Sequence, residues 1–483
     1  MCLQPVALPA GPGRISPIFI DLDSPGYSSR YRLPACLSRF IGTLTILIQK
    51  RNGYSRYHEV NCMRKVSSAF VLIILAAVVF VCGCTGTQTS SPQQGEAAQE
   101  IVVGALLPLT GDYAEGGEAS RVALEVAAGD INDYFTAIDS DYRVGVIIED
   151  TETDPAVALE KLQALDKQGV RIVIGPGSST ELNATRAYAD EHGIILISTM
   201  STAPSLAIAG DNVYRFVPPD TYQADAIAYY LKEEGTSAIV PVWRGDVWGD
   251  ELEKLAMASF RRDNGTVLDG VRYAPGEEDY AGMVADLDVQ VGRAIAAHGK
   301  EKVGVYLISF DAAAAIMEAA AKTRNLTEVR WYGCDGNVLL DTLVTGDAAR
   351  FAAQTRFTGP EFGRQDRAAS NAATIQKIRD ILRQQPDGYS LVSYDALWTV
   401  AMTRTQTDTT EISKLKIALE GTAGGAGGPL FGSVKLNGAG DRLTAQYTFW
   451  SVETDGEACR WVPNAQYSIW SAGEPPELER IDA

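Results

Sequence analysis

Histidine and cysteine, the side chains that most often carry metal ions and nucleophilic chemistry, are scarce in this chain of 483 residues. Beyond Cys84 the only cysteines are Cys334 and Cys459, and the only histidines are His192 and His298. No nucleophile elbow, group of four metal ligands or cofactor fingerprint accompanies them. We therefore expect no disulfide framework, no metal site, no cofactor and no catalytic residue, and a protein that is not an enzyme.

Basic residues are also few, because 42 Lys and Arg stand against 61 Asp and Glu, which gives a formal net charge of -19. The first 65 residues carry more basic than acidic side chains, so the acidity is concentrated after Cys84. A strongly acidic domain repels nucleic acid, and we expect no nucleic-acid partner. The length exceeds what one hydrophobic core usually serves, which predicts two domains.

The only long apolar run, residues 69–82, follows Met-Arg-Lys and precedes Gly83 and Cys84. This pattern is typical of a signal peptide, here residues 63–84, and the last two residues resemble a lipobox that makes Cys84 a lipidated N-terminus. We interpret residues 85–100 as a flexible tether and residues 1–62 as a doubtful N-terminal extension from an over-extended gene model.

The alternative is an uncleaved membrane anchor, although the run is shorter than the roughly 20 residues that span a bilayer. Either interpretation places residues 101–483 outside the cytoplasm, anchored to the outer face of the cell membrane.

Short apolar runs alternate with helical patterns from Ile101 onward, which predicts α/β architecture with parallel sheets. The expected strands are 101–107, 144–148, 171–174, 194–198, 238–242, 267–273, 303–308 and 329–333. Three helical stretches follow near 367–384, 391–405 and 411–420. The glycine-rich run 421–428 lacks the Lys-Ser/Thr ending of a phosphate loop, so we interpret it as a turn before a β-rich tail, 430–461.

Two hydroxyl-rich loops follow neighbouring strands of the first predicted sheet. Gly175-Pro-Gly-Ser-Ser179 opens a helix, and its backbone N–H groups and the hydroxyls of Ser178 and Ser179 form an anion site. The loop has no Lys or Arg, which favours a carboxylate over a phosphate. Residues 197–202 place further hydroxyls at the same sheet edge, where open α/β sheets bind ligands. Helix capping by Ser and Thr is the alternative explanation for each loop.

With these loops the chain resembles the type I periplasmic binding proteins of the leucine/isoleucine/valine-binding family over roughly 101–461. The resemblance rests on the order and spacing of several short motifs: Val103–Gly111, Ile174–Ser179, Gly193–Ser198 with Thr202-Ala-Pro, Val217–Tyr230, Trp248-Gly, Gly276–Tyr280, Tyr332–Gly336 and Ser393–Ala396. It implies two doubly wound parallel-sheet lobes joined by crossing hinge strands. Lobe 1 would comprise 101–220 plus 357–440, and lobe 2 would comprise 221–356 plus 441–475.

The same resemblance implies a ligand site between the lobes. The ligand carboxylate would lie against Ser178, Ser179, Met200 and Thr202, and Asp335 would hold the α-ammonium. A solvated Asp-Gly turn is the alternative for Asp335.

The cleft wall would come from Trp248 and Phe310, for which burial in the core is the alternative, and from Gly116. Gly116 stands where leucine-specific relatives present a tryptophan, so we expect a side-chain pocket that is larger or open to water.

The resemblance therefore implies an extracytoplasmic solute-binding lipoprotein of an ABC importer. It would capture an amino acid, branched-chain or similar, by hinge closure and deliver it as a monomer to a membrane permease. The alternative is a ligand-binding sensor or receptor module of the same fold for a small amide or aromatic acid.

Overall fold

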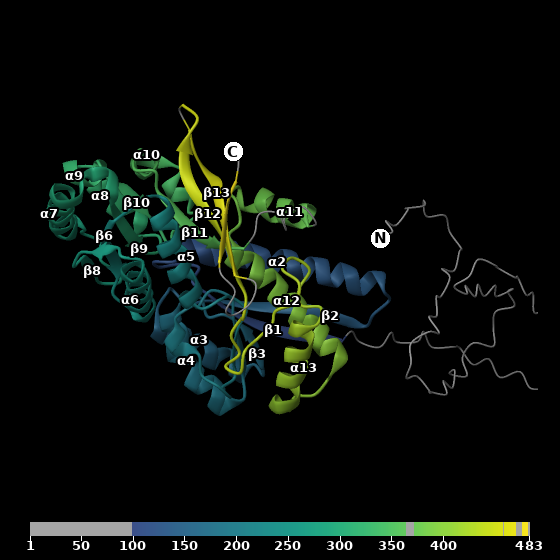
Figure 1. The fold of residues 1–483 in the computed structure, drawn as a ribbon. Helices are drawn as coiled ribbons and strands as arrows, with labels where there is room; N and C mark the ends of the chain where they lie inside the picture. Colours follow the sequence, from purple (N-terminus) through teal and green to yellow (C-terminus); the bar gives the residue numbers. More distant parts are fainter. Residues whose placement is uncertain (1–98, 364–370, 457, 470–475, 482–483) are drawn as a thin grey trace, which may run out of the picture. The chain divides into compact units, whose positions relative to one another are not determined.

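The computed structural model describes residues 99–363, 371–456, 458–469 and 476–481 (Figure 1). The predicted signal peptide 63–84, the lipidation site Cys84, the extension 1–62 and all of the tether before Gln99 lie outside the described residues. No described helix combines the length and the apolar content that crossing a membrane requires.

The first sheet is parallel, with strand order β2-β1-β3-β4-β5 in the described part of the chain. Its strands are β1 (Gln99–Leu107), β2 (Tyr142–Asp150), β3 (Ile172–Ile174), β4 (Ile195–Ser198) and β5 (Val213–Arg215). The connecting helices are α2 (Ala114–Ala137), α3 (Pro155–Lys167) and α4 (Ser179–His192). Apolar runs such as Ile195–Ile197 are buried completely because helices cover both faces of a parallel sheet. The sequence prediction missed β5.

The second sheet follows the order β14-β13-β12-β11-β10-β9-β6-β7, with β8 also paired to β6. Its strands are β6 (Ala238–Arg244), β7 (Thr266–Val267), β8 (Val271–Tyr273), β9 (Val303–Ile308), β10 (Arg330–Tyr332), β11 (Thr358–Phe362), β12 (Ala445–Thr454), β13 (Cys459–Ile469) and β14 (Glu477–Arg480). The helices α5 (Asp220–Glu233), α6 (Val247–Arg262), α7 (Ala281–His298), α8 (Ala313–Ala320), α9 (Arg324–Thr327) and α10 (Gly346–Gln354) accompany it. The strand predicted over 267–273 is two short strands.

The helices α11 (Ala372–Leu382), α12 (Gly388–Gln406) and α13 (Ile412–Gly424) return to the first lobe, and Figure 1 shows α12 alongside α2. The predicted boundary at 357 comes too early, because β11 pairs with β10 and β12 of the second sheet. The glycine-rich run is not simply a turn, since α13 continues through its first half. There the peptide groups stay within the helical hydrogen-bond pattern, and turn geometry begins only after Gly424.

The chain crosses between the lobes after β5, after β11 and before β12. A buried ion pair fixes the third crossing to the first lobe: Nε and Nη2 of Arg215 donate to the two carboxylate oxygens of Asp441, at 2.5 and 2.7 Å. Nη1 of Arg215 also donates to the carbonyl of Ala203, at 2.6 Å. This fork-to-carboxylate geometry satisfies most of the arginine's donors away from water.

Candidate binding site

The loop between β3 and α4 is held close to β1 by a glycine. Gly175 has a φ of +103°, and a Cβ on it would lie 2.2 Å from the carbonyl oxygen of Leu106, so only glycine fits there. Ser178 caps α4, because its Oγ accepts the N–H of Glu181 at 3.2 Å while Oε2 of Glu181 accepts the N–H of Ser178 at 2.6 Å. The hydroxyl oxygen of Ser178 therefore caps the helix, as the alternative explanation expects. The hydroxyl proton of Ser178 can still be donated to another group.

The second hydroxyl-rich loop, after β4, is joined directly to the first. Oγ of Ser179 accepts the N–H of Ala203 at 3.2 Å and lies 2.9 Å from Oγ of Ser201. Met200 is buried beside Ser120, whose hydroxyl lies 3.8 Å from its sulfur. Thr202 donates its hydroxyl to Asp220 at 2.9 Å. The two loops therefore form one continuous polar edge above the first sheet.

Asp335 follows β10 in the second lobe and is 6 % exposed. Its N–H donates to Oε1 of Gln223 at 2.9 Å, and its Oδ2 accepts the hydroxyl of Tyr389 from α12 at 2.5 Å. Oδ1 has no hydrogen-bond partner among the described residues. Burial raises the pKa of Asp335 because the charged form loses its hydration. A carboxylate in this position gains from an added cation.

A second buried acid lies close to Asp335. Asp220, at the start of α5, accepts hydrogen bonds from Thr202 and from Nε2 of Gln223. Burial raises its pKa first, and the charge of Asp335 raises it further. Asp335 and Asp220 thus make this side of the site electronegative. The opposite side, formed by the two serine loops, presents hydroxyl groups.

Three stacked aromatic rings form one wall of the site. Phe310 stacks on Trp248 with ring centroids 4.4 Å apart, and on its other side Tyr113 stacks on Phe310 at 4.2 Å. All three rings are at least 94 % buried. Tyr113 comes from the start of α2, so the stack joins residues of both lobes. The guanidinium of Arg244 lies 5.0 Å from the centroid of Phe310.

Most of the predicted site residues surround one space of about 230 Å³: Tyr113, Gly177, Ser178, Ser179, Met200, Trp248, Phe310, Asp335 and Gly336 line it. Thr202 is not in its lining. Gly116 lies instead beside a neighbouring space of about 340 Å³ that Asp335 also borders. The side-chain pocket is not enlarged at Gly116 in the described structure, because a Cβ there would lie 2.6 Å from the ring of Tyr113. Tyr113 fills the room that the missing side chain leaves.

Hydrogen bonds join the lobes along the rim of the site. Oδ2 of Asp112 accepts Nη1 of Arg244 at 2.7 Å and the N–H of Gly276 at 3.0 Å. Oδ2 of Asp311 accepts the N–H of Glu115 at 3.1 Å. Burial raises the pKa of Asp311 to about 7, and the charges of Glu115 and Asp112 add to the effect. These contacts tie the two lobes together beside the site.

Sequence reasoning missed Tyr113, Asp220 and Tyr389 as members of the site. Asp220 stands in Pro-Pro-Asp at a predicted helix start, a signal that could have drawn attention to it. Tyr113 and Tyr389 carry no local signal, since each acts through a partner far away in the sequence. No group of three His, Cys, Asp or Glu side chains in the described ranges is arranged to hold a metal ion.

Comparison with known proteins identifies relatives of this chain. The chain is 29% identical over 407 residues to an uncharacterized protein of Methanocaldococcus jannaschii, covering 79% of this chain and 94% of that one. It is 26% identical over 319 residues to Leu/Ile/Val-binding protein homolog 1 of Brucella abortus, covering 64% and 78%.

A solute binding protein of an ABC transporter from Rhodopseudomonas palustris, solved with 3,4-dihydroxy benzoic acid, superposes with a TM-score of 0.63. It shares 14% identity and is covered over 99% of its length by 77% of this chain, which shows a common fold. The family model for periplasmic binding proteins matches residues 100–457. The α/β fold with two parallel-strand sheets agrees with that match, and the chain belongs to the periplasmic binding protein family, in the type I branch that includes the Leu/Ile/Val-binding proteins.

Proposed function

We propose that this protein is the extracytoplasmic solute-binding subunit of an ABC importer, and that it captures an amino acid and delivers it to a membrane permease. The observation that carries the proposal is the polarity of the site. Hydroxyls of Ser178 and Ser179 border one side of the space, and Asp335, with an unpartnered oxygen, borders the other. An α-amino acid has a carboxylate and an ammonium group only a few bonds apart, which matches this arrangement.

In this proposal the ligand carboxylate binds Ser178 and Ser179, and Met200 and Thr202 hold the second loop in place. The ammonium group binds Asp335, and Trp248 and Phe310 cover the side chain. Because the site residues come from both lobes, ligand binding favours the joined arrangement of the lobes by its contacts with each. The permease would recognise that arrangement. No step requires bond making or breaking, which agrees with a family of solute-binding proteins.

An aromatic acid is the second candidate, because the Rhodopseudomonas palustris neighbour was solved with 3,4-dihydroxy benzoic acid and the wall here is a stack of aromatic rings. Such a ligand would use the serine loops in the same way. It would leave Asp335 without a cationic partner, so the two candidates differ in their dependence on that side chain.

The decisive experiment is calorimetric titration of the full chain with the standard amino acids, benzoate and 3,4-dihydroxybenzoate. Micromolar binding corresponds to about 8 kcal/mol and is readily detected. We expect saturable amino-acid binding that Asp335→Ala abolishes and that Asp286→Ala, an exposed aspartate of α7, leaves intact. Binding of benzoates alone, unaffected by Asp335→Ala, would replace the amino acid by an aromatic acid. Silence across the whole panel would overturn both candidates.

We also propose that the protein is a monomer held at the outer face of the membrane by lipid on Cys84. A single acyl chain binds membranes reversibly, so a diacyl anchor is expected. The native chain should fractionate with membranes and carry the mass of a lipid on its N-terminal cysteine, and Cys84→Ser should release it. Membrane retention of Cys84→Ser with residues 63–84 still attached would favour the uncleaved anchor.

A further inference from the structure

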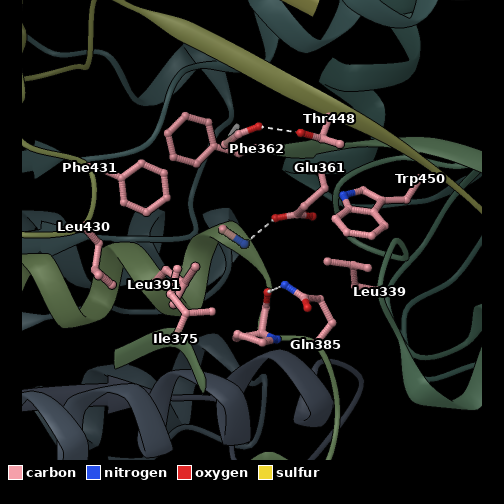
Figure 2. A pocket seen from close by; sticks show the side chains of 13 residues that line it. Leu339, Glu361, Phe362, Ile375, Gln385, Leu391, Leu430, Phe431, Thr448 and Trp450 are labelled. Carbon is pink, nitrogen blue, oxygen red and sulfur yellow. Dashed lines mark hydrogen bonds between the residues drawn. The ribbon is translucent and has the colours of Figure 1, made fainter. Parts of the chain in front are cut away.

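A second and larger pocket lies where the lobes are connected (Figure 2). We call it the hinge pocket; its empty space, with the part open to solvent included, is about 600 Å³, against about 230 Å³ on the same basis for the space bordered by Asp335 and the serines. β11 and β12 of the second sheet supply one side, and α11, α12 and the segment after α13 supply the other. The residues that matter below are Leu339, Glu361, Phe362, Leu391, Phe431 and Trp450. The pocket therefore contacts both lobes.

Glu361 is the only acidic side chain in the lining of the hinge pocket among the described residues. It is 3 % exposed, and its Oε1 accepts the N–H of Gly388 at 2.8 Å. Oε2 has no hydrogen-bond partner within the described ranges. Figure 2 shows this carboxyl group between Trp450 and the start of α12, with Leu339 below it. A buried carboxyl oxygen without a partner is costly, and a ligand that donates to it would remove that cost.

The surroundings of Glu361 favour a cationic donor. Burial raises the pKa of Glu361, and the negative charges of Asp387 and Asp335 raise it further, so the local field is negative. An anion would be repelled there, whereas an ammonium group would be attracted. The guanidinium of Arg442 lies 5.1 Å from the ring centroid of Phe362 and donates to the carbonyl of Phe216.

The rest of the lining fits an apolar body. Phe362 and Phe431 stack with centroids 5.3 Å apart, and Leu391 and Trp450 add aliphatic and aromatic surface. Pockets of this kind derive affinity from apolar contact and orientation from a few polar groups. We propose that the hinge pocket binds a small organic amine with an aromatic or branched apolar body, whose ammonium group donates to Oε2 of Glu361.

Two consecutive residues of α12 link the hinge pocket to the cleft. Gly388 donates its N–H to Glu361, and the next residue, Tyr389, donates its hydroxyl to Asp335. An amine in the hinge pocket contacts both lobes and fixes the start of α12 in the position that orients Asp335. It therefore raises the affinity of the cleft for its own ligand, and the effect is reciprocal. The amine site itself stands whether or not the cleft ligand is an amino acid.

The test uses 2-phenylethylamine as the probe, with 2-phenylethanol as its uncharged counterpart, titrated calorimetrically into the full chain. We expect saturable binding of the amine, weakened about ten- to a hundredfold in Glu361→Gln, because a hydrogen bond to a charged group is lost. The glutamine can still accept the N–H of Gly388. Leu391→Trp, which fills the pocket without changing charge, should weaken binding similarly. The alcohol should bind at least about tenfold more weakly than the amine.

Two control variants separate this site from the cleft. Glu253→Gln removes a carboxyl on α6 whose pKa burial also raises, and it should leave amine binding unchanged. Asp335→Asn should abolish amino-acid binding while amine binding persists. Loss of the amine in Asp335→Asn, with retention in Glu361→Gln and Leu391→Trp, would place the probe in the cleft and overturn the proposal. Equal affinity of amine and alcohol, or no saturable amine binding, would overturn it as well.

Discussion

Replacing Asp335 by asparagine should change folding stability and ligand affinity in opposite directions. The native carboxyl is buried, its Oδ1 has no partner among the described residues, and its pKa is raised. Folding therefore opposes ionisation of Asp335 at neutral pH. An asparagine does not ionise, and its oxygen can still accept the hydroxyl of Tyr389. The amide keeps a buried polar group at this position but carries no charge, so the ligand-free variant avoids the cost of a buried, unpaired charge and should gain roughly 1 kcal/mol at neutral pH.

The pH dependence gives this gain a distinct signature. The folded-state pKa of Asp335 lies above its unfolded value, so the native protein loses stability as the pH rises from about 4 toward the folded value. The variant lacks this loss. Denaturant midpoints of the two chains should therefore separate at pH 7 and converge near pH 4. A control, Asp286→Asn on the exposed face of α7, should show neither effect.

Ligand affinity should fall while stability rises. Removing one partner of a buried ion pair costs about 3–5 kcal/mol, which corresponds to roughly a hundred- to a few thousandfold in dissociation constant. Calorimetry on the same preparations measures this directly. If the variant instead unfolds more easily at pH 7 and binds an amino acid as tightly as the native protein, Asp335 is a structural residue and the reasoning about the cleft is wrong.

Three further predictions test the frame around the site. Asp441→Ala should lower the unfolding free energy by about 3–5 kcal/mol, measured by denaturant titration, because it leaves the charge of Arg215 buried; Asp441→Asn should cost less. The protonated form of Asp311 favours the joined lobes, where burial raises its pKa to about 7, so the ratio of native to Asp311→Asn solute affinity should fall as the pH rises from about 4 to 7 and then level off. Gly175→Ala should destabilise the fold by about 1–3 kcal/mol and weaken solute binding, as its Cβ would strike Leu106; retained binding would contradict the assigned loop geometry.

Much of the fold could be predicted because buried parallel strands are continuous apolar runs separated by helical periodicity. β5 escaped because it spans only Val213–Arg215 and ends in a charged residue. That arginine is buried only because Asp441 reaches it from 226 positions further along the chain. The sequence prediction also missed β11, which contains Pro360 and Glu361 and shows no alternation of apolar and polar residues that would indicate a strand. Periodicity reports local burial, and these residues are buried by partners that no local window contains.

The two serines show how far the sequence could define the site. Capping and ligand binding were alternative explanations for the loop. In the structure the oxygen of each hydroxyl accepts a hydrogen bond from the protein, while its proton is a separate donor. The oxygens of Ser178 and Ser179 accept backbone N–H groups from Glu181 and Ala203, so each hydroxyl keeps its proton for a further acceptor. For Ser178 that acceptor can be a group entering the space it lines or the carboxylate of Glu181, and Ser179 has Ser201 within reach.

Hydroxyls that already accept from the backbone present donors to a ligand, and a donor-lined edge suits an anionic group. Across the same space, Asp335 presents an acceptor without a partner in the described chain. Local capping thus sets the polarity of one edge, and tertiary burial sets the polarity of the other. A ligand with only a carboxylate would satisfy the first edge and leave the buried acid uncompensated, whereas a zwitterion satisfies both. This difference is the physical reason for favouring an amino acid over a benzoate.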